Sequence, residues 1–188
     1  GKIVAVFHRL GFDEVYDTST GADLTVLEES NEFLKRLEEG KADMPLFTSC
    51  CPAWVQYCEI NYPELLENVS TCRSPMEMFA SFIHEEHKTS ARKHYHVAVM
   101  PCTAKKFEAT REEYVLDGKN PVDAVITTQE LIQMIKESGI IFSEIEPEAV
   151  DMPFGASTGA GVIFGVTGGV TEAVLRRVSS DKSKTALS

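Results

Sequence analysis

Two short apolar runs that end in cysteine and proline constrain the fold most. Residues 45–50 have the length of a strand and run into Cys-Cys-Pro at 50–52, where the proline suits the first turn of a helix. Residues 95–100 predict a second, buried strand that runs into Pro-Cys at 101–102. Because ligands gather at the carboxyl ends of strands in open α/β sheets, these thiols mark the candidate site.

The rest of the chain shows helical spacing between strand-like runs. We predict a further strand over 122–126 and helices over 22–40, 75–93, 128–139 and 161–177. Strands that alternate with helices predict an α/β domain, with largely parallel sheets flanked by helices. Residues 1–178 form this domain, and residues 179–188 predict a linker-like tail.

Composition places the chain among ordinary globular proteins. Its 188 residues suit one compact domain, with 43% hydrophobic and 25% charged residues. Asp and Glu number 29 against 18 Lys and Arg, which gives a formal net charge of −11. This acidity makes nucleic acid and anionic membrane surfaces poor partners, and we expect no nucleic-acid partner.

One uncharged stretch, residues 152–171, has the length of a membrane span. Its glycines, proline and threonines leave too little hydrocarbon for stable insertion, so we expect no span. The spacing of Gly159, Gly161 and Gly165 is out of step with a dinucleotide-binding loop and predicts a tight turn before a closely packed helix. The first residues show no signal-peptide core, and we expect a cytoplasmic protein.

The five cysteines do not suggest a disulfide framework, since their number is odd and Cys50 and Cys51 are adjacent. Reduced thiols fit better, as metal ligands, as catalytic groups or as small buried side chains. We expect Cys58 and Cys72 to be buried core residues. Without a CxxC pair or a histidine at ligand spacing, we expect no complete zinc site within this chain.

Several segments resemble the iron-only (FeFe) hydrogenases. The three most specific are Phe-Thr-Ser-Cys-Cys-Pro-Ala-Trp at 47–54, Val-Met-Pro-Cys-Thr-Ala-Lys-Lys-Phe-Glu at 99–108 and Gly-Ala-Gly-Val-Ile-Phe-Gly-Val-Thr-Gly-Gly-Val-Thr-Glu at 159–172. Residues 70–75 and 123–128 also resemble that family's catalytic domain. The likeness covers nearly the whole chain and implies that residues 1–178 are the central part of such a domain, which is incomplete here.

The resemblance implies a cofactor, the H-cluster. This is a four-iron four-sulfur cubane joined through a cysteine sulfur to a two-iron unit that carries carbon monoxide, cyanide and an azadithiolate. By motif, Cys51 and Cys102 resemble two of the cubane's ligands, and thiolates suit iron–sulfur clusters. The other two ligands belong to a third cysteine motif that this sequence lacks, so the chain alone is expected to be inactive and to need the remaining segments of a larger subunit.

Further residues resemble those around the two-iron unit. Cys50 resembles the family's non-ligating cysteine, which carries a proton, and the Lys105 ammonium can hydrogen-bond a cyanide nitrogen. The resemblance implies further cofactor contacts at Met100, Pro101, Phe164 and Ser74. The alternative for Met100 and Phe164 is that they are ordinary core residues. The alternative for Lys105 is a solvated surface lysine, although the adjacent Lys106 is a more natural candidate for that.

Proton delivery needs groups that are spaced for relay. Glu29, Glu32 and Arg36 recur every three or four residues and so share a helical face, and Ser70 could join them to Cys50 through a water. These four residues resemble the family's proton pathway. Without the resemblance, an exposed Glu32–Arg36 pair worth about 0.3–0.5 kcal/mol would be the better interpretation.

Two places depart from the family pattern. Ala53 replaces the usual glycine after Cys-Cys-Pro, and Met76 with Glu77 replaces the usual Gln-Gln after Ser-Pro. Both changes can retune the surroundings of the cluster, and neither removes a ligand.

The resemblance implies an oxidoreductase that reversibly reduces protons to dihydrogen and exchanges electrons with a ferredoxin-type or other iron–sulfur carrier. One rival hypothesis is a non-catalytic relative that acts in cytosolic iron–sulfur assembly. Cys50 discriminates, because assembly relatives typically lack a cysteine there. A second rival is a sensory hydrogenase, which slow hydrogen turnover by the intact subunit would distinguish.

Overall fold

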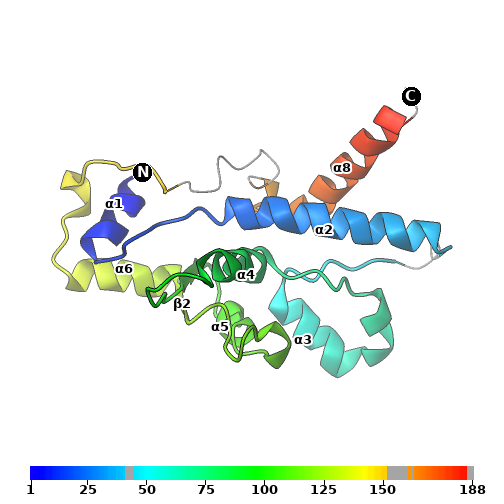
Figure 1. Ribbon diagram of the computed structural model, residues 1–188, viewed down its shortest axis with the longest axis horizontal. Coiled ribbons are helices and arrows are strands. Elements are labelled where there is room, and N and C mark those ends of the chain that lie inside the picture. The colour runs from blue at the N-terminus through cyan, green and yellow to red at the C-terminus, as the bar shows by residue number, and fades with distance from the viewer. Residues whose placement is uncertain (41–44, 152–160, 162, 186–188) are drawn as a thin grey trace.

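The computed structural model describes residues 1–40, 45–151, 161 and 163–185, with side chains described as far as residue 180. Its elements are α1 Lys2–Arg9, α2 Ser19–Glu38, α3 Pro52–Asn61, η1 Pro63–Asn68, α4 Pro75–His87, β1 Val97–Met100, α5 Ala104–Glu108, η2 Glu112–Tyr114, β2 Ala124–Thr127, α6 Thr128–Glu137, η3 Phe142–Glu144 and α8 Gly169–Thr185. The long helix α2 crosses the molecule, with α4 beneath it and α8 rising from it toward the C-terminus (Figure 1).

Strands β1 and β2 form a parallel pair in which Met100 is the partner of Thr127. Each strand leads directly into a helix, β1 into α5 and β2 into α6, so the carboxyl ends of both strands face the same edge. Helix α6 begins with a capping box, in which the Thr127 side chain and Glu130 are bonded reciprocally. This arrangement confirms the α/β class.

The strand predicted over 45–50 is wrong as a regular strand. Phe47 makes an isolated parallel bridge to Val69, in which Phe47 N donates to Asn68 O and Ser70 N donates to Phe47 O, both at 2.8 Å. The pairing stays this short because the partner segment begins only where η1 ends and soon gives way to α4. The bridge nevertheless fixes Ser70 beside the segment that carries the paired cysteines.

Two helices differ most at their ends from the sequence prediction. Helix α4 ends at His87 rather than at residue 93, because residues 88–93 are polar and offer no apolar face to bury. Of the helix predicted over 161–177, residues 161 and 163 are helical, but turns and a bend interrupt it over 164–168. Helix α8 begins after them at Gly169 and continues through Thr185 into the predicted linker. Half of the uncharged stretch 152–171 lies outside the described residues.

Helices α2 and α4 approach each other closely at Gly21. A Cβ there would lie 2.3 Å from Pro75 O and 2.7 Å from Phe79 Cβ, so only glycine permits this approach. Gly40, with a φ of +75°, follows the end of α2 as the sequence predicts. The close contact packs the first turn of α2 against the beginning of α4.

Two groups of buried side chains form the core. One joins α4 to the sheet through Met76, Ala80, Met100 and Val122. The other joins α1 to the segment around Ile145 through Ala5 and Val6. The candidate site lies beside the first group, because Met100 ends β1 next to Cys102.

Candidate functional site

The two predicted cluster ligands lie at separate corners that α5 joins. Cys51 is the N-cap of α3 and Cys102 lies in the turn between β1 and α5, and both side chains are exposed. Lys105 Nζ donates to Cys50 O at 2.9 Å, which links the first turn of α5 to the Cys50–Cys51 corner. Arg111 adds a second link between these regions by donating to both carboxylate oxygens of Glu59 on α3.

Lys105 is not a solvated surface lysine. Its Nζ lies 2.7 Å from Glu108 Oε2, and the two side chains are only 12% and 1% exposed. Glu108 is a site residue that the sequence prediction missed, although its spacing of three residues from Lys105 in a helix was an available signal. Lys106, by contrast, pairs at the surface with Glu130.

Glu32 is held by donors from three residues. Arg36 Nη2 lies 2.7 Å from Glu32 Oε1, the Ser70 hydroxyl donates to Oε2 at 2.7 Å and Thr71 N donates to Oε2 at 3.1 Å. Arg36 also donates to Glu67 O and Val69 O, which fixes its guanidinium. The Glu32 and Arg36 side chains are only 18% and 19% exposed, so they are not the exposed pair of the alternative interpretation.

Glu29 lies one turn before Glu32 but has no hydrogen-bond partner for either carboxylate oxygen in the described part of the chain. The residue is 1% exposed. Burial, with a smaller contribution from the Glu32 charge, raises the pKa of Glu29 to about 7, and the nearby Ser70 hydroxyl and Ser49 backbone offset only part of this rise. The carboxyl can therefore gain or lose a proton near neutral pH.

Cys50 is influenced by both Glu29 on α2 and Lys105 on α5. Burial and the negative charge of Glu29 raise the pKa of its thiol, and the Lys105 ammonium lowers that pKa to a smaller extent. The Cys50 side chain is half-buried, whereas its neighbour Cys51 is exposed. The structure thus separates the two thiols, with one turned toward the interior carboxyl and the other toward the surface.

The remaining predicted contacts are more dispersed. Met100 is buried, Pro101 is exposed, and the fully buried Ser74 hydroxyl accepts from Glu77 N at 3.4 Å as the N-cap of α4. Phe164 is half-buried in the turn before α8, and its contact with the cofactor stays a prediction. Cys58 is fully buried as expected, whereas Cys72 is half-buried.

Glu77 on α4 is a second buried carboxyl without a hydrogen-bond partner in the described residues. Burial and the nearby Glu108 charge raise its pKa to about 7, while Arg73 and Lys105 oppose the rise. The sequence identified Glu77 only as a departure from the family pattern, since no local signal shows that it is buried.

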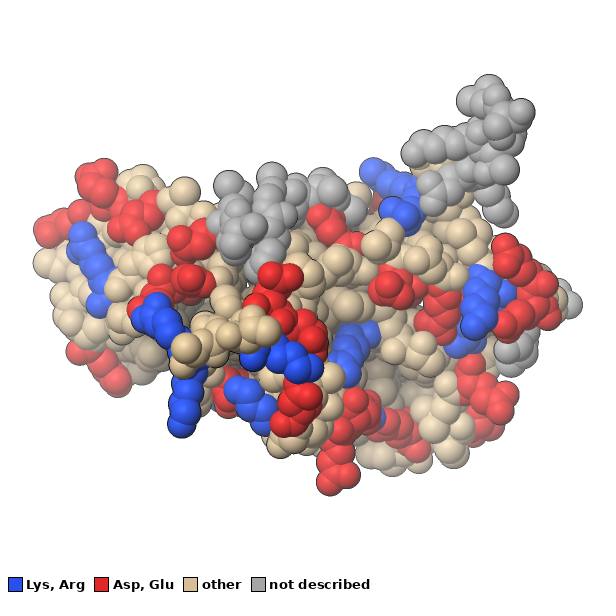
Figure 2. Space-filling view, viewed as in Figure 1, with Lys and Arg blue, Asp and Glu red and all other residues tan. Residues whose placement is uncertain are grey.

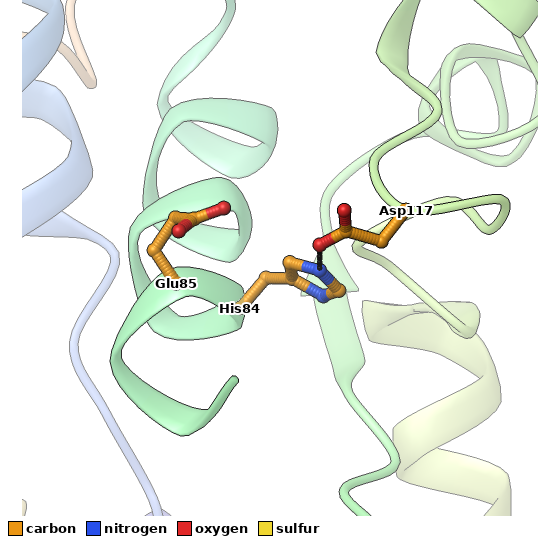
Figure 3. A group of neighbouring side chains, drawn as sticks. All are labelled: His84, Glu85 and Asp117. Carbon is orange, nitrogen blue, oxygen red and sulfur yellow. Dashed lines mark hydrogen bonds and ion pairs between the residues drawn. The ribbon is translucent and has the colours of Figure 1, made fainter. Parts of the chain in front are cut away.

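A separate cluster lies at the far end of α4. His84 Nε2 hydrogen-bonds Asp117 Oδ2 at 3.1 Å, and the ligand atoms of His84, Glu85 and Asp117 lie within 4.8 Å of one another (Figure 3). Lys88 Nζ lies 3.0 Å from Asp117 and 3.2 Å from Glu85. The lysine already supplies the positive charge, so we interpret this cluster as a surface ion-pair group.

The face shown in Figure 2 carries basic side chains singly or in small groups among acidic ones. In the described part of the chain, no helix combines the length and the apolar character that crossing a membrane requires.

Comparison with known proteins identifies the family. The sequence profile of the iron only hydrogenase large subunit, C-terminal domain, matches residues 1–188. The chain is 45% identical over 180 residues to iron hydrogenase 1 of Clostridium pasteurianum, covering 94% of this chain and 31% of that protein. It is 47% identical over 182 residues to the periplasmic Fe hydrogenase large subunit of Nitratidesulfovibrio vulgaris, covering 94% of this chain and 43% of that protein.

More distant relatives have a different role. A protein of Xenopus tropicalis named as a cytosolic Fe-S cluster assembly factor is 32% identical over 193 residues, covering 96% of this chain and 40% of that protein. The chain thus spans less than half the length of each of these relatives.

Solved structures share the fold. A HydA structure described as revealing stepwise FeFe-hydrogenase H-cluster assembly matches with a TM-score of 0.81 and 45% identity, over 94% of this chain and 45% of that chain. A variant of the apo FeFe hydrogenase HydA1 from Chlamydomonas reinhardtii matches with a TM-score of 0.80 and 44% identity, over 94% of this chain and 46% of that chain. The chain therefore belongs to the family of iron-only hydrogenase large subunits, within their C-terminal domain.

Proposed function

We propose that this chain is the part of a FeFe hydrogenase catalytic domain that supplies two cluster ligands and a proton path. The complete subunit would reversibly reduce protons to dihydrogen. The observation that carries the proposal is the bare, buried Glu29 carboxyl, which lies one helical turn from Glu32 and acts electrostatically on Cys50. A structural ion pair needs no such carboxyl, whereas a proton relay does.

The donor set fits the H-cluster. Cys51 and Cys102 present exposed thiols, and soft thiolate ligands suit an iron–sulfur cubane. Lys105 adds a largely buried ammonium beside Cys50, which suits an anionic cyanide ligand. When bound, the cluster would supply the electrons and the iron at which two protons become dihydrogen.

The chain's own residues would hold and pass protons. Arg36 and the Ser70 hydroxyl fix the Glu32 carboxylate, which orients it toward the interior. Glu29 can bind a proton near neutral pH because its carboxyl is buried. Cys50 completes the path, since its half-buried thiol lies within electrostatic reach of Glu29 and next to a ligand position.

Cys50 also favours this function over iron–sulfur assembly, because a scaffold needs cluster ligands but no adjacent proton-carrying thiol. The electron carrier, expected to be a ferredoxin-type protein, belongs to the same proposal. A cytoplasmic location stays a prediction, since one relative is named as periplasmic.

The substitution Cys50→Ala in the full-length subunit tests the proposal. We expect hydrogen evolution and uptake to fall by about a hundredfold or more, because a methyl group cannot relay a proton. Iron content and cluster spectra should not change. Cys50→Asp should keep part of the activity, since a carboxyl restores an exchangeable proton.

Cys58→Ala is the matched control, because it removes a buried thiol of α3 that lies outside the proposed path. Loss of the cluster in Cys50→Ala would show that Cys50 is a ligand. Full activity in Cys50→Ala would show that the proton takes another route, and in either case the assigned role of Cys50 is wrong.

A further inference from the structure

Glu77 is a buried carboxyl that the proposed proton path does not use. It lies in the first turn of α4, its side chain is fully buried and neither of its oxygens has a hydrogen-bond partner in the described part of the chain. An ionised carboxyl in such a place lacks the hydrogen bonds that normally compensate for lost water. Its charge therefore depends on the charged groups that surround it.

Those groups come from three other segments. Lys105 and Glu108 on α5 and Arg73 before α4 act electrostatically on Glu77, and the pKa of Tyr114 in η2 responds to the Glu77 charge. Arg73 is fixed by its bond to Ser81 Oγ at 2.6 Å and lies 5.3 Å from the Tyr114 ring centre.

Lys105 therefore interacts with two buried carboxyls, since it is bonded to Glu108 and acts electrostatically on Glu77. The same ammonium also donates to Cys50 O at the candidate site. With Glu77 neutral, Glu108 balances one of the two cations, and one positive charge remains in excess. With Glu77 ionised, the two acids balance Lys105 and Arg73, and no excess remains.

We propose that Glu77 is a positioning residue that acts through Lys105: when neutral it leaves the buried group around Lys105 the excess positive charge that an anionic ligand beside Cys50 requires, and when ionised it cancels that charge. Burial and Glu108 hold the Glu77 pKa near 7, so both forms exist around neutral pH. The identity of the anion as a cyanide ligand of the H-cluster rests on the proposed function. The protonation of Glu77 does not.

Infrared spectroscopy of the full-length subunit without its two-iron unit tests the first half of the proposal. We expect a C=O band of a protonated carboxyl to disappear between pH 5 and pH 9, with a midpoint near 7, and Glu77→Gln to remove that component. Glu77→Met, which also lacks the proton, should remove the same component. Glu29→Gln is the matched control, because it removes a different buried carboxyl. An unchanged difference spectrum in both Glu77 variants would overturn the proposal.

The cyanide stretching bands of the loaded subunit test the second half. In the unmodified protein we expect these bands to shift between pH 6 and pH 9, and in Glu77→Gln to stay at their low-pH positions. Glu86→Gln, an exposed change on the same helix, should shift like the unmodified protein. A shift that persists in Glu77→Gln, or that is missing from the unmodified protein, would overturn the coupling to Lys105. A loaded subunit without cyanide bands would refute the hydrogenase proposal, while the first test would still decide the protonation of Glu77.

Discussion

Two groups of buried acids flank Cys50, one on α2 and one around α5. Each group contains one carboxylate that is hydrogen-bonded and one carboxyl that is not, but the charges around them differ. On the α2 side, Arg36 and the Ser70 hydroxyl hold Glu32, while Glu29 on the same helical face has no hydrogen-bond partner in the described residues. The Glu32 charge acts on Glu29 to a smaller extent than burial does, and Glu32 is itself paired with Arg36, which is 19% exposed.

On the α5 side, Lys105 holds Glu108, while Glu77 has no hydrogen-bond partner in the described residues. Here the bare carboxyl responds to two cations and one anion rather than to hydroxyl and backbone groups. Both bare carboxyls have a pKa near 7.

This difference separates two roles for a buried acid. A carboxyl such as Glu29, near a hydroxyl, a backbone group and a carboxylate that is already paired, can exchange a proton while the Glu32–Arg36 pair stays in place. A carboxyl among buried charges, such as Glu77, changes the balance of its whole group when it ionises. We therefore expect the α2 side to move protons and the α5 side to set the charge that faces the cofactor.

The largest effect should follow Lys105→Asn. Removing the ammonium leaves Glu108, 1% exposed, as a buried charge without its partner. Breaking a buried pair in this way costs about 3–5 kcal/mol. Denaturant unfolding of the full-length subunit should show a loss of this size, and infrared spectra should show that most of the mature active site is lost.

The double variant Lys105→Asn with Glu108→Gln sharpens this test. Because it removes both charges, it should recover much of the lost stability without recovering the active site. Equal stability of the single variant and the unmodified protein would mean that Glu108 does not depend on Lys105, and the contrast between the two sides would fail.

A pH-dependent effect should follow Glu29→Gln. The fold raises the pKa of Glu29 from 4.5 to about 7, so the folded state binds this proton more tightly than the unfolded state. The resulting stabilisation is complete below about pH 4.5 and is lost as the pH rises through about 7. This rise in the Glu29 pKa corresponds to about 3 kcal/mol of unfolding free energy.

The difference in unfolding free energy between Glu29→Gln and the unmodified protein should therefore favour the variant more at pH 8 than at pH 4.5, by about 3 kcal/mol. Unfolding free energies measured at the two pH values check this. A difference that does not change with pH would show that Glu29 stays ionised in the fold, which would remove the observation that carries the proposed function.

Local patterns in the sequence predict the α2 side well and the α5 side poorly. Glu29, Glu32 and Arg36 share a face because helical spacing is a local property, and the structure keeps them on one helix. The contact between Ser70 and Glu32 joins residues far apart in sequence, and only the resemblance to hydrogenases indicated it.

Burial explains most of what the sequence did not show. Glu77 is polar and lies in the first turn of a helix, where a solvated acid is common, so nothing local predicts that tertiary packing covers it. The strand expected over 45–50 fails for a related reason, since a strand needs a partner and, among the residues that the structure describes, only Val69 bridges to it. The cofactor and the role of each site residue stay predictions.

The smallest effect should follow Lys106→Met, which is the matched comparison for Lys105→Asn. Lys106 Nζ lies 2.6 Å from Glu130 Oε1, but the side chains are 40% and 49% exposed, so water can replace the lost contact. Glu130 also keeps its bond from Thr127 N at 2.7 Å, which leaves the cap of α6 intact. We expect a change in unfolding free energy far below that of Lys105→Asn, and one that high salt abolishes because exposed pairs are screened. A loss as large as that of Lys105→Asn would show that the strength of these lysine pairs does not depend on burial, and the distinction between the buried and surface faces of α5 would fall.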